Sequence, residues 1–165
     1  QFRSGWNWWS CYVDLSDIDG LAMLEESLGD VGVQIKSQSN FVINYGSTWL
    51  GGLNALTNEQ AVKIQTNAPV TVELRGLPLS PAEHPITLNV GWNWIGYPCA
   101  NSMSLNEAFA NYTPANGDQV KTQSSYAVYR TGVGWMGALQ TLNPGDGLLY
   151  YSNAGGTLVF PENSR

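Results

Sequence analysis

The chain has 165 residues, which suits one ordinary domain or two small ones. Only 12% of the residues are charged, whereas 43% are hydrophobic and 12% are aromatic, a balance typical of a β-rich, turn-rich protein rather than a helical bundle or a disordered tail. The net charge of −6, with only seven Lys and Arg, argues against a nucleic-acid partner and against an anionic membrane surface. Because no apolar run approaches the ~20 residues of a membrane-spanning helix, we also expect no membrane insertion.

A tandem repeat organises the sequence. The four residues Gly-Trp-Asn-Trp at 5–8 return at 91–94, an offset of 86 positions (92 − 6 = 86). Three further blocks return in the same order: Lys-Ser-Gln-Ser at 36–39 as Lys-Thr-Gln-Ser at 121–124, Trp-Leu-Gly-Gly-Leu at 49–53 as Trp-Met-Gly-Ala-Leu at 135–139, and Thr-Val at 71–72 as Thr-Leu at 157–158. We predict a duplication, with repeat one at 1–79 and repeat two at 80–165. Each copy is near the lower size for a core of its own, so we expect the two to pack together as one module.

The expected elements recur in both copies. Repeat one should have a strand at 5–13, a short helix at 21–28 that stops at Gly29, an alternating strand at 34–45, and closing strands at 62–66 and 70–74. Repeat two should have a helix that begins at a capping box of Ser104 and Glu107, an alternating strand at 119–130, and closing strands at 148–152 and 157–160. The chain opens inside what repeat two shows as a strand, so we expect a module cut from a longer protein.

The predicted fold class is β-rich α+β, as two pseudo-symmetric tandem repeats, each mainly antiparallel β with one short helix. A sandwich and a barrel both remain compatible with this pattern. A connector at 77–85, punctuated by three prolines, should act as a fixed spacer between the copies.

Catalysis has little support in the sequence, and we expect no enzyme. The only histidine, His84, lies in the connector, which removes Ser-His-Asp and Cys-His arrangements and His-based metal sites. The carboxylates lie mostly in expected helices or turns, and nothing pairs two of them across a cleft. Cys11 and Cys99 occupy non-equivalent positions in the repeats; they form either a disulfide, if the two Cα atoms come within about 7 Å, or two inert buried thiols.

No cofactor is expected, with calcium as the weaker alternative. Asp14, Asp17 and Asp19 precede Gly20, and closely spaced carboxylates beside a glycine turn suit a hard cation. The alternative is that Asp17 or Ser16 caps the following helix and that the other carboxylates favour its positive end. Repeat two has no equivalent cluster.

Aromatic side chains carry the clearest functional signal. A Trp or Tyr ring exposed on a β-surface can stack on the C–H face of a sugar while neighbouring amides bond its hydroxyls. The tryptophans of the two Gly-Trp-Asn-Trp blocks recur at identical places, as core residues would, so we expect most of them to be core. Trp9 lies on the opposite side of its strand and is replaced by Ile95 in repeat two, so Trp9 is the better candidate for binding.

Other candidates lie on turns or polar strands. Trp49 and Trp135 follow glycine-containing turns, where an aromatic ring is more easily presented to solvent, and Tyr45 and Tyr129 are weaker candidates of the same type. Polar contacts to a ligand are expected from the repeated Lys-Ser/Thr-Gln block, through Gln38 and Gln123. The alternative for this block is an exposed strand face with ordinary solubilising residues.

The combined blocks, in this order, resemble the tandem Gly-Trp-Asn-Trp modules of secreted and surface proteins of gut Bacteroidetes, some attached to polysaccharide-degrading enzymes. The resemblance covers 5–161 and implies an extracellular or cell-surface, non-catalytic accessory module. We therefore expect a carbohydrate-binding module that targets an attached catalytic or surface domain to a neutral plant-type polysaccharide such as xylan, β-glucan or mannan. The alternative is a structural or adhesive spacer with no glycan affinity.

Overall fold

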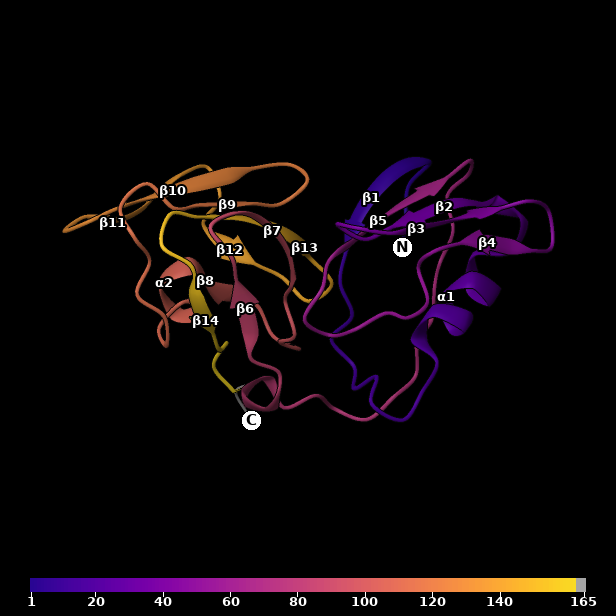
Figure 1. Ribbon diagram of the computed structural model, residues 1–165, viewed down its shortest axis with the longest axis horizontal. Helices are drawn as coiled ribbons and strands as arrows, with labels where there is room; N and C mark the ends of the chain where they lie inside the picture. Colours follow the sequence, from indigo (N-terminus) through magenta and orange to yellow (C-terminus); the bar gives the residue numbers. More distant parts are fainter. Residues whose placement is uncertain (163–165) are drawn as a thin grey trace.

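The computed structural model describes residues 1–162, and two five-stranded antiparallel sheets dominate it, one in each half of the chain (Figure 1). The first sheet has the order β1-β5-β2-β3-β4. Its strands are β1 (Gly5–Trp9), β5 (Val62–Thr66), β2 (Gly32–Lys36), β3 (Phe41–Asn44) and β4 (Trp49–Gly51). The second sheet has the order β7-β13-β9-β10-β11. Its strands are β7 (Gly91–Gly96), β13 (Gly147–Ser152), β9 (Gln119–Lys121), β10 (Tyr126–Arg130) and β11 (Gly134–Gly137).

Two small two-stranded sheets complete the second half, β12 (Thr141–Leu142) with β8 (Met103–Ser104) and β14 (Gly156–Leu158) with β6 (Ile86–Leu88). Short 3₁₀ turns lie at Gly29–Val31 and Pro81–Glu83. The expectation of a β-rich chain with few helices and antiparallel pairing is confirmed. Within residues 1–162, no helix is long and apolar enough to cross a membrane.

Each half has one short α-helix, as the sequence predicts. Helix α1 (Gly20–Leu28) ends at Gly29, whose φ of 50° suits a glycine. Its N-cap is Asp19, which accepts a 3.0 Å hydrogen bond from the Ala22 amide, so the expectation that Asp17 or Ser16 caps this helix is wrong. Helix α2 (Leu105–Ala108) has only one turn, and the predicted capping box of Ser104 and Glu107 is present.

The hydrophobic core is divided between the halves. Leu24 and Leu28 of α1 pack in one buried cluster with the inward side of the first sheet, including Ile35 and Ile64. A separate buried cluster in the second half has more aromatic members, among them Tyr97, Tyr150 and Phe160. Both helices lie on the same side of the two sheets (Figure 1). The opposite side of each sheet is therefore left without a helix over it.

The long alternating strand expected at 34–45 is instead a hairpin. Residues 37–40 form a turn, closed by a 2.8 Å bond from the Ser37 amide to the Asn40 carbonyl. The turn places Val42 opposite Ile35, and both are buried. The polar run Ser-Gln-Ser-Asn is itself a turn signal, which outweighed the apparent alternation. The strand expected at 119–130 is divided in the same way, into β9 and β10.

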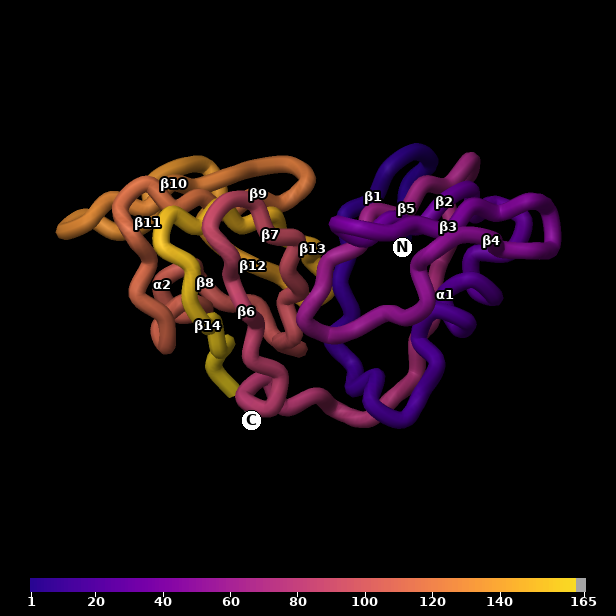
Figure 2. Tube along the Cα trace, viewed as in Figure 1, coloured from indigo at the N-terminus to yellow at the C-terminus, as the bar shows by residue number. Residues whose placement is uncertain are grey.

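The connector joins halves that lie side by side, as the trace in Figure 2 shows. Leu79 and Pro81 are buried, and Asp14 donates a 3.0 Å backbone bond to Leu77. The connector is therefore held against the protein, as expected of a fixed spacer. Cys11 and Cys99 are free and buried, so they are two buried thiols rather than a disulfide. Burial raises the pKa of Cys11, and it raises the pKa of Cys99 to about 12.

Candidate ligand-binding face

The uncovered side of the first sheet carries aromatic and lysine side chains. Strand register places Trp8 opposite Lys63 across β1 and β5, and Lys36 opposite Phe41 across β2 and β3. The intervening residues of these strands, such as Ile64, are buried in the core. Because side chains alternate along a strand, this series points away from the core.

The second sheet carries a similar series on its uncovered side, with Leu149 rather than a lysine opposite Trp94. Trp92 stands opposite Tyr151 across β7 and β13, with ring centroids 5.2 Å apart, and Lys121 stands opposite Tyr126 across β9 and β10. We call the combined surface the aromatic face. It comprises Trp6, Trp8, Phe41, Trp92, Trp94, Tyr126 and Tyr151 with Lys36, Lys63 and Lys121. The most exposed of its rings are Trp6 (38%), Trp92 (40%), Phe41 (45%) and Tyr126 (54%).

A lysine joins the two parts of the aromatic face. The Lys63 ammonium lies 4.3 Å from the Trp8 ring centroid and 4.2 Å from that of Trp94, so one cation contacts an indole from each half. Burial lowers the pKa of Lys63, and the neighbouring charge of Lys36 lowers it further. Cation–π contacts of this kind contribute about 0.5–1 kcal/mol each at exposed sites.

The expectation that the tryptophans of the Gly-Trp-Asn-Trp blocks form the core is wrong for Trp6 and Trp92, which are exposed. In each block, the asparagine between the two tryptophans points inward. The Asn93 side chain is 5% exposed and donates to the carbonyls of Asn89 and Gly91, so it closes the turn before β7. Asn7 makes the corresponding bonds in the first half. With asparagine committed to the inner side, alternation places the tryptophans outside.

Trp9, Trp49 and Trp135 are placed against the two cores. Trp9 and Trp49 are half-buried and pack on the first cluster, and Trp135 packs on the second, with its ring centroid 5.1 Å from that of Phe109. The expectation that the glycine turns present Trp49 and Trp135 to solvent is wrong, because their strands β4 and β11 are edge strands whose alternate residues turn inward. Their role in binding stays a prediction.

Tyr45 and Tyr129 differ in accessibility. Tyr45 lies in the β3–β4 turn and is 66% exposed, so it is free to contact a ligand near the distal edge of the first sheet. Tyr129 is half-buried and packs edge-on against Trp135 with a centroid separation of 5.4 Å.

The side chains of Gln38 and Gln123 bind backbone rather than standing free. From the β2–β3 turn, Gln38 donates to the Trp92 carbonyl and accepts from the Trp94 amide, both at 2.8 Å. From the β9–β10 turn, Gln123 makes the same two bonds, at 2.6 and 2.9 Å, with the backbone of β1. Each glutamine side-chain amide thus pairs with the edge strand of the other half's sheet. It satisfies one backbone N–H and one backbone carbonyl that the edge strand would otherwise leave unpaired.

A second pair of contacts joins the halves at the C-terminal ends of β1 and β7. The loop before β5 and the loop before β13 each bridge the other half. The bridges pair Gln60 with Ile95 and Asp146 with Trp9, and the accompanying backbone bonds run from Gly96 to Glu59 at 2.9 Å and from Ser10 to Gly145 at 3.1 Å. The interface is therefore built from two sets of matching contacts.

A cleft of about 720 Å³ lies between the halves. It is lined by Trp8 and Trp9 together with Tyr12, Arg75, Gln123 and Asp146, among others. Burial raises the pKa of Asp146, whose carboxylate accepts from the Asn143 amide at 2.8 Å. Trp9 lines this cleft, so the cleft is a second place at which a small molecule has room to bind.

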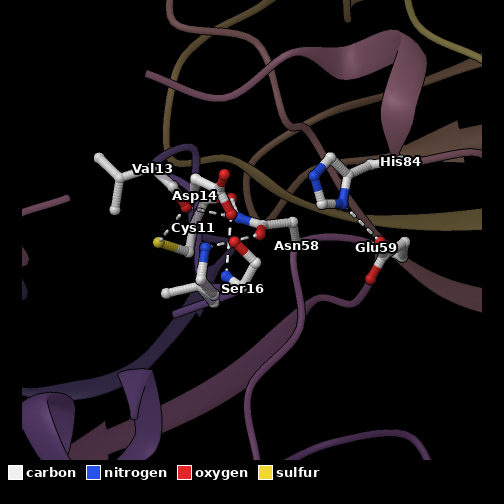
Figure 3. A network of polar contacts seen from close by, with 8 residues as sticks. Cys11, Val13, Asp14, Ser16, Asn58, Glu59 and His84 are labelled. Carbon is white, nitrogen blue, oxygen red and sulfur yellow. Dashed lines mark hydrogen bonds and ion pairs between the residues drawn. The ribbon is translucent and has the colours of Figure 1, made fainter. Parts of the chain in front are cut away.

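The acidic cluster at 14–19 holds local structure. The Asp14 carboxylate accepts a 2.8 Å bond from the Ser16 amide, a contact that lowers its pKa, and Asp19 caps α1. Figure 3 shows Asp14 and Ser16 beside Asn58, which donates to the carbonyls of Cys11 and Val13. Within residues 1–162, no group of three or more His, Cys, Asp or Glu is arranged to hold a metal ion.

His84 pairs with Glu59 across the halves, at 2.7 Å from Nδ1 to Oε1 (Figure 3). Burial pushes the pKa of Glu59 upward, but hydrogen bonds from His84, from its own backbone and from Thr57 outweigh it, so the net shift is downward. The pair ties the connector to the loop before β5.

Comparisons with protein-family models, with curated proteins and with solved structures find no match to this chain.

Proposed function

We propose that this chain is a non-catalytic carbohydrate-binding module in which the aromatic face holds an attached enzyme or surface protein on a polysaccharide. The observation that carries the proposal is the exposure of Trp6 and Trp92, at 38% and 40%, on sheet surfaces that no helix covers. Indole rings presented in this way offer flat apolar area to the C–H face of a sugar ring. The amides of Gln34, Gln65 and Gln119 follow the same side of the strands and can bond sugar hydroxyls.

The proposal includes the finer architecture, two pseudo-symmetric repeats that arose by duplication. Three kinds of correspondence support it: the two sheets have the same strand order, their Gly-Trp-Asn-Trp strands both lie at the edge, and each contact of Gln38 has a counterpart at Gln123. A duplicated face provides two related subsites for one polymer. Linked subsites raise the overall affinity above that of either alone.

An extracellular or cell-surface location follows from this function, because polysaccharide of the expected plant type lies outside the cell. The sequence-based expectation of a neutral glycan, namely xylan, β-glucan or mannan, stays a prediction. The proposed function also implies a neighbouring catalytic or surface domain as partner.

The second candidate is a structural or adhesive spacer. The observation that favours it is the reciprocal interface, in which glutamine amides and backbone bridges fix the two halves against each other. A rigid pair of this kind would hold a neighbouring domain at a set distance, and the aromatic face would then cover another protein surface.

Affinity gel electrophoresis against soluble polysaccharides tests the proposal. We expect at least one glycan to retard the protein, and we expect Trp6→Ala and Trp92→Ala to reduce the retardation while the circular dichroism spectrum stays unchanged. The matched control is Tyr12→Ala, because Tyr12 is also 38% exposed but lines the cleft. Loss of binding in Tyr12→Ala alone would move the site to the cleft.

The sequence-based candidates are tested in the same gels with Trp9→Ala, Trp49→Ala and Trp135→Ala. Because these rings pack on the cores, we expect these variants to lose stability in a urea titration. Retardation by no glycan at all would leave the spacer as the function.

A further inference from the structure

Charge is divided unevenly between the two large sheets and the rest of the protein. The chain has 13 Asp and Glu against seven Lys and Arg. Nevertheless, the ten strands of the two five-stranded sheets contain no Asp or Glu. They contain all three lysines of the chain and one arginine, namely Lys36, Lys63, Lys121 and Arg130. Every charged residue of these strands is therefore a cation.

The three lysines share the aromatic face. Lys36 lies 5.9 Å from the Trp6 centroid, and Lys121 lies 4.9 Å from that of Trp92, in addition to the contacts of Lys63 with both halves. Within residues 1–162, the ion pairs are Arg75 with Glu73 and His84 with Glu59, so no carboxylate neutralises these ammonium groups. The face is thus locally positive on a protein whose net charge is −6.

One pair of lysines is placed unfavourably for stability alone. Lys36 stands directly opposite Lys63 across β2 and β5. Like charges in such cross-strand positions destabilise a sheet, whereas opposite charges would contribute roughly 0.2–1 kcal/mol. A glutamate at either position would give the sheet a favourable pair. The arrangement is explained if an external anion neutralises both lysines.

We propose that the aromatic face selects polysaccharides that carry anionic groups, carboxylate or sulfate, over neutral ones. The inference rests on the proposed function, keeps the aromatic face as the site, and replaces the neutral glycan expected from the sequence with an anionic one. Sugar rings stack on Trp6 and Trp92, and the anionic substituents bind Lys36, Lys63 and Lys121. A neutral glycan would cover these ammonium groups without compensating their lost hydration, which is a cost rather than a gain.

Single-stranded nucleic acid combines stacking with phosphate charge and is the other polymer that such a face suggests. The proposed function favours a glycan, but the four cations of the strands do not separate the two classes, because polygalacturonate also has a charge on every unit. Polyuridylate is therefore included in the test.

The experiment uses polymer pairs that differ only in charge: dextran sulfate against dextran, and polygalacturonate against its methyl ester. Affinity electrophoresis of the full chain is run in low and in high salt. We expect the charged member of at least one pair to bind about tenfold more tightly, and we expect this preference to shrink in high salt, where screening removes the Coulombic part. A preference in the sulfate pair or in the galacturonate pair identifies the anionic group.

Variants assign the preference to residues. We expect Lys36→Gln and Lys121→Gln each to weaken binding of the charged polymer about two- to fivefold, with no change for its neutral partner. The matched control is Arg3→Gln, which removes the same charge from an exposed residue outside both sheets and outside the cleft and should have no effect. Thermal unfolding measured by circular dichroism checks that each variant is folded.

Three results would overturn the inference, and they are distinguishable. Equal binding of both members of each pair, with losses in Trp6→Ala, would leave a carbohydrate-binding module without anionic selectivity. Binding of no polysaccharide would instead overturn the proposed function. Tighter binding of polyuridylate than of any glycan, lost in the lysine variants, would replace the ligand class with nucleic acid.

Discussion

The two halves use the same sheet order but fill its inner side differently. In the first half, Ile64 lies at the centre of β5 and packs beneath the nine-residue helix α1. At the corresponding place in β13 the second half has Tyr150, which is fully buried and bonded to the buried carboxylate of Asp118. The interface contacts match between the halves, and the outward sides share their tryptophans, although Leu149 and Tyr151 stand where the first half has Lys63 and Gln65. The comparison indicates that the paired tryptophans and the glutamine contacts carry a shared constraint that the cores do not.

The polar core of the second half depends on Asp118. Its carboxylate accepts from the Tyr150 hydroxyl at 2.7 Å, from the Ala115 amide at 3.1 Å, and from the backbone and side chain of Asn153 at 2.9 and 3.1 Å. A buried carboxylate is tolerated here because four donors replace its water. The first half has no such network at its sheet centre.

The largest predicted effect follows from this difference. Asp118→Ala leaves the Tyr150 hydroxyl and backbone amides without acceptors, and buried donors of this kind cost roughly 1–3 kcal/mol each. We expect the free energy of unfolding to fall by about 3 kcal/mol or more in a urea titration. The control is Asp30→Ala, which removes the same charge from an exposed turn of the first half and should cost about 0.5 kcal/mol or less. Equal effects of the two substitutions would contradict the proposed division.

The interface provides a smaller test in which the halves should behave alike. Gln38→Ala and Gln123→Ala each remove two hydrogen bonds from an edge strand, and we expect each to cost about 1–2 kcal/mol because a typical bond contributes about 1 kcal/mol. Both substitutions weaken the same interface between the halves. The free-energy cost of the double variant should therefore differ from the sum of the two single costs in a double-mutant cycle. Strictly additive costs would indicate that the two contacts act independently.

The smallest predicted effect concerns pH. The folded-state pKa of Glu59 lies below its ordinary value of 4.5, so its contribution is present above that value and is lost as the pH falls through the folded-state pKa. The Glu59 side chain is 34% exposed, so we expect Glu59→Gln to cost only about 0.2–1 kcal/mol at pH 7. The gap between variant and parent should close in urea titrations at pH 3. A gap that persists at that pH would assign the effect to packing instead.

Local signals in the sequence predict much of the fold. The capping box at Ser104, the stop at Gly29 and the strand Val62–Thr66 all form where short-range chemistry places them. The alternation of side chains at 34–45 continues through the polar residues 37–40 and hides the hairpin turn there. The polar composition of 37–40 is the sequence signal that indicates a turn, and the same holds for the turn between β9 and β10.

The candidate site was less predictable, for a physical reason. Asn7 and Asn93 recur as faithfully as the tryptophans beside them, and repetition alone cannot decide which side of a strand is buried. The decision lies in hydrogen bonds from asparagine to the preceding turn, such as those of Asn93 with Asn89. Likewise, the contacts of Lys63 with Trp8 and Trp94 depend on register between strands and on how the halves meet. The spacing of residues along the chain indicates neither the asparagine hydrogen bonds nor the Lys63 contacts.

The central claim is that the exposed tryptophans of the aromatic face, rather than those packed on the cores, contact the ligand. The chain has seven tryptophans, and each gives one indole N–H signal in a ¹⁵N-labelled sample that single Trp→Phe variants can assign. On titration with a bound polysaccharide, we predict that the signals of Trp6 and Trp92 shift most and that those of Trp49 and Trp135 stay in place. Shifts confined to Trp9, Trp49 or Trp135 would show that the ligand does not bind at the aromatic face.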